Sequence, residues 1–202
     1  MAAFVASVPV EKLAKKGDDK VVKHVFDAGH ISHLKRYQLD NYFTNIFSAG
    51  RYNCVSASAF YYYALQQLGI AAQIHETPNH IYIVAYPQTL KILLETTDPL
   101  LGFQPLSSKY AKEYISIMQA VKLVSEEEMA GYGTDEAFEQ LFFADKEVSL
   151  LGLAGIQYLN SGLYHYEAKN YRKAYQEFKK AMYIYPDSRS QAMLVVSVAL
   201  IL

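Results

Sequence analysis

The clearest indication of the fold comes from residues 51–69, which read RYNCVSASAFYYYALQQLG. A long run without Gly or Pro follows Cys54, and such a run predicts a helix because these two residues disfavour a helix interior most. Asn53 is a favoured N-cap residue, and Gly69 is a favoured residue just beyond a helix end. Cys54 is therefore expected in the first turn of a helix that stops near Gly69.

Short runs rich in β-branched and aromatic residues follow this helix and predict antiparallel strands in a small sheet. The runs are 72–77, 81–86 and 90–96. Turn residues separate these runs and are expected to close the sheet region. They are Pro78-Asn79, Pro87-Gln88-Thr89, Pro99, Gly102 and Pro105.

Helical spacing of charged and apolar residues marks the regions on either side of the sheet. Residues 10–49 predict two or three short helices, broken at Ala28-Gly29 and at Ala49-Gly50. Residues 107–121 predict a further helix, and Glu126 to Glu128 predict an acidic linker after it.

The composition is that of an ordinary folded protein. The 202 residues are 51% hydrophobic and 19% charged with a net charge of -1, so there is no electrostatic footprint for nucleic acid or an anionic membrane. The single cysteine excludes an intrachain disulfide. The apolar stretch 192–202 is shorter than the roughly 20 residues needed to span a bilayer. Residues 1–10 would fit the remnant of a signal peptide of a periplasmic or secreted protein, and a cytoplasmic location is the alternative.

From Glu147 onward the chain is expected to be helical to its end, and a repeat-like spacing lies within this region. Small, aromatic and proline residues fall on the positions of a frame of about 34 residues that starts at Gly155. They are Tyr158, Gly162, Ala174, Phe178, Ala181 and Pro186. The spacing resembles the tetratricopeptide repeat, although Ser161 and His165 stand where larger apolar residues are common. A plain helical hairpin is the alternative. One repeat cannot bury both of its faces, so it must stack on the preceding domain or on further repeats.

Ionisable side chains are expected to meet near the start of the Cys54 helix. A first-turn thiol lies at the positive end of the helix dipole, where free N–H groups favour an anion. His80 opens the predicted strand 81–86 and would face that helix start as a base for the thiol. Glu95 and Asp98 both lie at the end of the next strand, where either carboxylate could hold the imidazole. Taken alone, each residue also has a structural explanation, and a lone cysteine is usually a small core residue.

The order of these residues resembles the transglutaminase-like superfamily, which shares the papain-type core. The segments that carry the resemblance are Asn53 to Ala59, His80 to Ile83 and Leu94 to Pro99. The resemblance implies Cys54 as the nucleophile, His80 as the base and Glu95 as the residue that orients it, with Asp98 as the competing acid. The interval from Cys54 to His80 is short for the family, Asn79 stands where Gly is common, and Glu95 stands where Asp is usual.

The resemblance implies cysteine-dependent acyl transfer or hydrolysis at a peptide or amide bond of a peptide or protein substrate. The N–H of Cys54 and the Asn53 side chain would stabilise the oxyanion, and His75 and Tyr82 are expected to line the cleft. Similar bacterial proteins join such a core to tetratricopeptide repeats, so the C-terminal helices would bind a protein partner or form a wall of the cleft. The alternatives are an inactive binding scaffold with the same fold and one piece of a longer repeat protein.

Together these patterns predict an α+β fold in two parts. Residues 1–125 would form a papain-like, transglutaminase-like core, with the Cys54 helix packed on a small antiparallel sheet, and residues 145–202 a tetratricopeptide-like helical hairpin. No cofactor or metal is expected. His30 and His33 are spaced as two ligands on one helix face would be, but no third ligand is evident, and a solvated helix face is the prediction.

Overall fold

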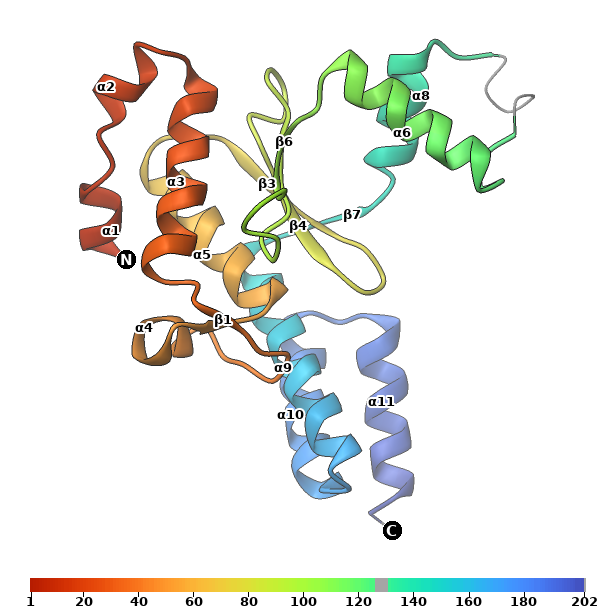
Figure 1. Ribbon diagram of the computed structural model, residues 1–202. Coiled ribbons are helices and arrows are strands. Elements are labelled where there is room, and N and C mark those ends of the chain that lie inside the picture. The colour runs from red at the N-terminus through yellow and green to blue at the C-terminus, as the bar shows by residue number, and fades with distance from the viewer. Residues whose placement is uncertain (126–130, 202) are drawn as a thin grey trace.

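The computed structural model describes residues 1–125 and 131–201 and has an α+β architecture (Figure 1). Helices make up 56% and strands 12% of the described residues, which confirms the predicted class. A small antiparallel sheet lies in the middle, helices cover both of its faces, and three C-terminal helices extend away from it (Figure 1). The predicted linker at Glu126 to Glu128 lies outside the described residues.

Helix α5, Cys54–Gln67, is the central helix of the core and begins where the sequence predicts. Asn53 is its N-cap residue, and the chain leaves the helix at Gly69 with a φ of 75°, a conformation that glycine adopts without strain. Large side chains on several sides of the helix are fully buried, and they include Phe60, Tyr61 and Leu65. A helix that is apolar on most sides belongs in a core, and α5 lies between the sheet and α3.

The main sheet has the strand order β6-β5-β4-β3-β7, with every neighbouring pair antiparallel. The strands are β3 Ala72–Glu76, β4 Ile81–Ala85, β5 Ile92–Leu94, β6 Phe103–Pro105 and β7 Lys146–Val148. Ile83 of the central strand pairs with Ile74 on one side and Leu94 on the other. The two faces of β4 contact different helices. Ile83 packs with the core around α3 and α5, whereas Tyr82 and Val84 pack with α6 and α8.

The three predicted strands are confirmed, but two further strands lie where the sequence predicts none. Residues 103–105 add β6 to one edge of the sheet. Glu147, from which helix is predicted, lies in β7 and pairs with His75 of β3. Both strands are only three residues long, too short to show the alternating pattern that identifies a strand.

The N-terminal region contains the short helices that the sequence predicts, together with a two-stranded parallel sheet that it does not. The elements are α1 Ala2–Ala6, α2 Val10–Ala14, α3 Asp18–Ser32, β1 Arg36–Tyr37, α4 Asn45–Ala49 and β2 Arg51–Tyr52. The predicted break at Ala28-Gly29 is wrong, because α3 runs through both residues. A Cβ at Gly29 would lie 2.7 Å from the ring of Tyr61. The glycine therefore allows α3 and α5 to approach closely.

The prediction that His30 and His33 lie on a solvated helix face is wrong for His30. Its ring is buried among Phe26, Tyr61 and Tyr52, with ring centroids 4.7, 5.6 and 6.0 Å away. Burial lowers the pKa of His30, because an apolar environment disfavours the charged imidazolium. His33 lies at the end of the helix, where its Nδ1 is 2.6 Å from the hydroxyl of Ser32.

Helices α6, Ser108–Ala120, and α8, Thr134–Phe142, cover the second face of the sheet. The first is the helix predicted over residues 107–121, and its N-cap is Ser107. The second was not expected from the sequence. Phe138 and Phe142 of α8 stack at 4.8 Å and pack with Tyr82 and Val84 of β4.

The C-terminal region consists of α9 Leu150–Glu167, α10 Tyr171–Ile184 and α11 Ser188–Ala199. Helices α9 and α10 pack closely as a hairpin, while α9 also contacts α5 of the core (Figure 1). Ala174, Phe178 and Ala181 of α10 are completely buried in this contact. Pro186 lies between α10 and α11, where the sequence predicts a helix end.

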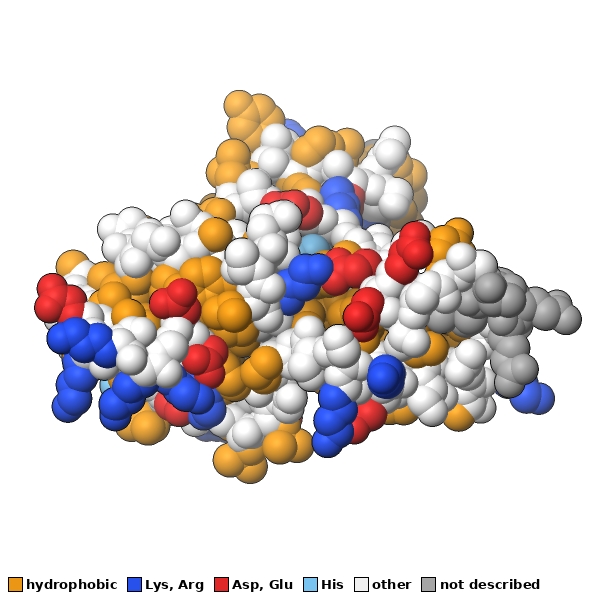
Figure 2. Space-filling model, turned by 90° about the horizontal axis from the view of Figure 1, so that it is seen from above, with side chains coloured by type: hydrophobic (Ala, Val, Ile, Leu, Met, Phe, Trp, Pro, Cys, Tyr) orange, Lys and Arg blue, Asp and Glu red, His pale blue; other side chains and the backbone are white. Residues whose placement is uncertain are grey.

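No helix among the described residues is long and apolar enough to cross a membrane. On the face seen from above, acidic and basic side chains are intermixed, and hydrophobic side chains lie exposed between them (Figure 2). The Lys and Arg side chains seen on this face form no continuous stripe (Figure 2).

Replacing Gly162 with Ala should lower the free energy of unfolding by about 1–3 kcal/mol. The new Cβ would lie 2.4 Å from ring carbons of Phe178, and this clash outweighs the higher helix propensity of alanine. Urea unfolding followed by circular dichroism measures the change. Gly131→Ala is the control, because a Cβ there meets nothing within 4 Å. Equal stabilities of the two variants would contradict the close packing of α9 on α10.

Candidate active site

Cys54 is the first residue of α5, and its thiol is partly exposed. A reciprocal cap fixes this helix start: the Asn53 Oδ1 accepts the Ser56 N–H at 2.9 Å, and the Ser56 Oγ accepts the Asn53 N–H at 2.9 Å. The N–H groups of Cys54 and Val55 have no acceptor within the described chain. They lie at the positive end of the helix dipole, where they can donate to a developing oxyanion.

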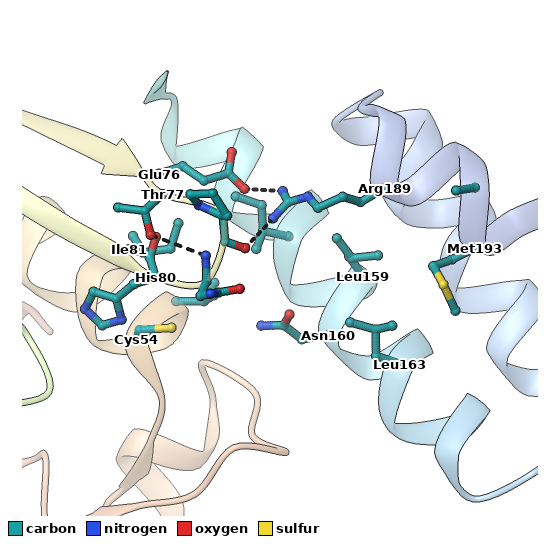
Figure 3. Close-up of a pocket in the computed structure, with 15 residues that line it drawn as sticks. Cys54, Glu76, Thr77, His80, Ile81, Leu159, Asn160, Leu163, Arg189 and Met193 are labelled. Atoms are coloured by element: carbon teal, nitrogen blue, oxygen red, sulfur yellow. Dashed lines mark hydrogen bonds and ion pairs between the residues drawn. The ribbon is translucent and has the colours of Figure 1, made fainter. Parts of the chain in front are cut away.

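His80 lies in the turn between β3 and β4, beside the start of α5 (Figure 3). Its carbonyl accepts the N–H of Thr77 at 2.9 Å, which closes the turn. The His80 Nε2 lies 2.5 Å from the Glu95 Oε2, so Nδ1 is the ring nitrogen available to the thiol. The Cys54 sulfur lies beside the imidazole in Figure 3. The structure thus brings together the thiol, the imidazole and the carboxylate of Cys54, His80 and Glu95.

Glu95 directly follows β5, and hydrogen bonds hold its carboxylate in place. Its Oε1 accepts the N–H and the hydroxyl of Thr97 at 3.0 and 2.6 Å, which leaves Oε2 for the imidazole. The neighbouring Thr96 is fully buried, and its hydroxyl lies 3.1 Å from that of Ser58 in α5. Ser58 lies about one helical turn after Cys54, so this contact fixes the acid relative to the helix that carries the thiol.

The electrostatics of the site favour a charged imidazole. The hydrogen-bonding contact with Cys54 and then that with Glu95 raise the pKa of His80 to about 10, against the opposing effect of burial. Burial raises the pKa of Glu95, but the hydrogen bonds from His80 and Thr97 outweigh it and leave that pKa below its usual value. Near neutral pH the site therefore contains an imidazolium between two groups that can carry negative charge.

A pocket of about 490 Å³ opens beside Cys54 and His80 and faces helices α9 and α11 (Figure 3). Its far wall is formed mainly by apolar side chains of these helices: Ile156, Leu159, Leu163, Ala192 and Met193, with Asn160 among them. The C-terminal helices thus form one wall of the candidate cleft.

Arg189 of α11 ties the turn between β3 and β4 to the C-terminal helices (Figure 3). Its guanidinium forms an ion pair with Glu76 and donates to the carbonyl of Pro78 at 3.3 Å. The hydroxyl of Tyr185 donates to the second oxygen of Glu76 at 2.6 Å. Glu76 is only 8% exposed, so its carboxylate depends on these partners for stabilisation.

The structure confirms Asn53 as the N-cap of α5 but does not make its side chain available as an oxyanion donor. Its side chain is fully buried, and its Nδ2 donates to the carbonyls of Leu39 at 3.0 Å and Asn41 at 3.4 Å. Its Oδ1 is occupied by the helix cap. Because both ends of the amide are engaged inside the core, the side chain is not available to an oxyanion on Cys54, and that part of the prediction is wrong.

Asp98 does not serve as the acid. Its Oδ1 accepts the N–H groups of Leu100 and Leu101, both at 2.9 Å, within the turn that follows β5. The imidazole contact is made by Glu95 instead.

His75 and Tyr82 do not line the cleft, contrary to the prediction. Their rings stack on each other 5.2 Å apart with an interplanar angle of 10°. The Tyr82 hydroxyl donates to the carbonyl of Phe142 at 3.2 Å, on the side of α8. The reason is the alternation of side chains along a strand: Glu76 and Ile81 line the pocket, so their neighbours point to the opposite face.

Tyr37, Asn160 and Arg189 are polar residues near the site that the sequence does not predict. Burial raises the pKa of Tyr37, and so do the nearby Cys54 and Glu95, which indicates that its phenol lies close to both. The pairing of β1 with β2, in which Tyr37 lies opposite Tyr52, places it there, and no sequence pattern predicts this pairing. No sequence pattern marks Asn160 either, because only the packing of α9 on the core brings it to the pocket.

No protein-family model matches this chain, and comparisons with curated proteins and with solved structures also found no match.

An NMR titration of the His80 ring should show a midpoint near pH 10 in the wild-type protein. Glu95→Gln should move the midpoint toward the ordinary value of about 6.5, because the charged partner that favours the imidazolium is lost. Asp98→Asn is the control and should leave the midpoint unchanged. Since the folded-state pKa is raised, the stabilisation from these contacts is complete below about pH 6.5 and is lost as the pH rises through about 10. An ordinary midpoint in the wild-type protein would contradict the arrangement.

Replacing Arg189 with Met should lower the free energy of unfolding by about 2–4 kcal/mol, because it leaves the buried Glu76 carboxylate without its cation. Urea unfolding at pH 7 measures the loss. The control is Lys23→Met, which removes an exposed pair with Asp27 and should change stability by less than about 0.5 kcal/mol. A similarly small change for Arg189→Met would show that the ion pair does not hold α11 to the sheet.

Proposed function

We propose that this protein is a cysteine-dependent acyl-transfer enzyme of the transglutaminase-like kind, acting on a peptide or amide bond. Cys54 is the nucleophile, His80 the general base and acid, and Glu95 the residue that orients His80. The observation that carries the proposal is the 2.5 Å contact between His80 and Glu95 beside a thiol at a capped helix start, with Cys54 and His80 open to a pocket.

The first half of the reaction forms a thioester. The Cys54 sulfur attacks the carbonyl carbon, and the carbonyl oxygen takes up the negative charge and accepts hydrogen bonds from the N–H groups of Cys54 and Val55. The imidazolium of His80 then gives its proton to the amide nitrogen, the carbon–nitrogen bond breaks, and the amine leaves. The acyl group remains on the sulfur, and His80 is neutral.

The second half transfers the acyl group. Neutral His80 takes a proton from water or from an amine, which attacks the thioester carbon, and the sulfur leaves with the electron pair of the broken carbon–sulfur bond. Water gives a carboxylic acid and an amine gives a new amide, so hydrolysis and transglutamination share one acyl-enzyme. Glu95 keeps the Nδ1 of His80 directed at the reacting atoms in both halves, because its own Oε1 is held by Thr97.

The contribution of the imidazole can be measured as the rate at which iodoacetamide alkylates Cys54 at pH 7. We expect rapid labelling of the folded wild-type protein and a rate at least about 10-fold lower for His80→Ala, because an adjacent imidazolium stabilises the thiolate that reacts. His24→Ala is the matched control, since His24 makes no contact with the site. Labelling only after unfolding would favour a binding scaffold without turnover.

Turnover can be measured with a library of fluorogenic peptide amides, with and without an added primary amine. Cys54→Ala should abolish turnover, and His80→Ala should lower kcat/KM by at least about 100-fold. Mass spectrometry then separates the acid product of hydrolysis from the amide product of transfer. Equal rates for wild-type and Cys54→Ala proteins would contradict the proposal.

A further inference from the structure

The pocket beside Cys54 is assembled from two parts of the chain. The β3–β4 turn and the start of α5 form the wall that carries the thiol and the imidazole, while α9 and α11 form the opposite wall (Figure 3). Its volume of about 490 Å³ lies within the range of about 300–1,000 Å³ that is typical of ligand sites. The bound group would therefore touch the C-terminal helices while its carbonyl lies at Cys54.

The charges in the wall of this pocket are already paired. Arg189 contacts Glu76 and the Asp187 carboxylate, the latter at 2.7 Å. A charged group entering the pocket would lose its hydration without gaining a free counter-ion, which is unfavourable. An apolar group would instead contact Leu159, Leu163 and the other aliphatic side chains of the far wall. The pocket thus discriminates in favour of apolar groups.

Asn160 is the one polar side chain of α9 in this wall. Its amide points into the pocket toward Cys54 (Figure 3) and makes no hydrogen bond within the described residues. A side-chain amide offers both a donor and an acceptor, which are the two groups that a peptide backbone needs when it is removed from water. The other side chains that α9 contributes, Ile156, Leu159 and Leu163, offer neither.

We propose that this pocket binds the acyl-donor segment of a peptide substrate through one bulky apolar side chain, and that Asn160 hydrogen-bonds the backbone of that segment. The inference rests on the proposed acyl-transfer function and adds the substrate class to it. Asn160 is a substrate-binding residue supplied by the C-terminal helices, so the catalytic residues of the core and the specificity of the enzyme come from different parts of the fold.

The test uses peptidyl vinyl sulfones, which alkylate a reactive cysteine without requiring turnover. The residue that bears the vinyl sulfone, or the one before it, is leucine, phenylalanine, aspartate or lysine. For the wild-type protein we expect second-order labelling rates at Cys54 about 10- to 100-fold higher for the apolar probes than for the charged ones. Iodoacetamide, which is too small to fill the pocket, reports the reactivity of the thiol separately.

Four variants locate the preference. Ala192→Trp should fill the pocket and lower the rate for the leucine probe at least about 10-fold, whereas Gln191→Trp, at the adjacent exposed position outside the pocket, should not. Asn160→Ala and the uncharged, similarly sized Asn160→Leu should both slow every peptidyl probe about 10-fold or more, because both lack the N–H donor. In all four variants the iodoacetamide rate should match that of the wild-type protein, which shows that the site is still folded.

The outcomes separate the two proposals. The pocket assignment would be overturned by equal labelling rates for apolar and charged probes. It would also be overturned if the Ala192→Trp and Asn160 variants reacted with the probes like the wild-type protein. In either case, rapid labelling by iodoacetamide would leave the acyl-transfer proposal standing. Slow labelling of the folded wild-type protein by iodoacetamide and by every probe would overturn both.

Discussion

A buried side-chain amide at the start of one helix holds the candidate site together. Asn53 caps α5 through its oxygen and bonds the carbonyls of Leu39 and Asn41 through its nitrogen, while Asn41 in turn donates to the hydroxyl of Ser56 at 3.2 Å. Unpaired polar groups are costly in an interior of low dielectric, so this network permits only one position for the first turn. The position of the Cys54 sulfur follows from it.

The remaining site residues are fixed against α5 by contacts from different directions. The hydroxyl contact between Ser58 and Thr96 places the strand end that carries Glu95, and Arg189 holds the turn that carries His80. The site therefore lies where the core meets the C-terminal helices, and ligand pockets often occur at such junctions. The core supplies the thiol, and the C-terminal helices supply the opposite wall of the pocket. Neither part of the chain alone encloses the pocket.

Sequence reasoning predicted the α+β class, the helix start at Cys54 and the three central strands, because each depends on residues a few positions apart. It failed where longer-range contacts decide. Gly29 was predicted to break a helix, but its missing side chain makes room for Tyr61. The strands β6 and β7 are too short to show a pattern and exist only as edge partners in the sheet. The prediction that His75 lines the cleft is wrong, because strand alternation directs its side chain to the opposite face of the sheet.

By itself, the sequence determined the cap at Asn53, the helix after it, the strands around His80 and the small residues that let α9 approach α10, because local propensities and close-packing requirements act within a few turns of chain. Only the tertiary structure decided that Glu95 and not Asp98 meets His80, that Asn53 is engaged in the core, and that Asn160 faces Cys54. Those outcomes depend on how separate helices and strands pack together. This packing is driven by many small contributions from the burial of apolar surface, and no single short motif predicts their sum.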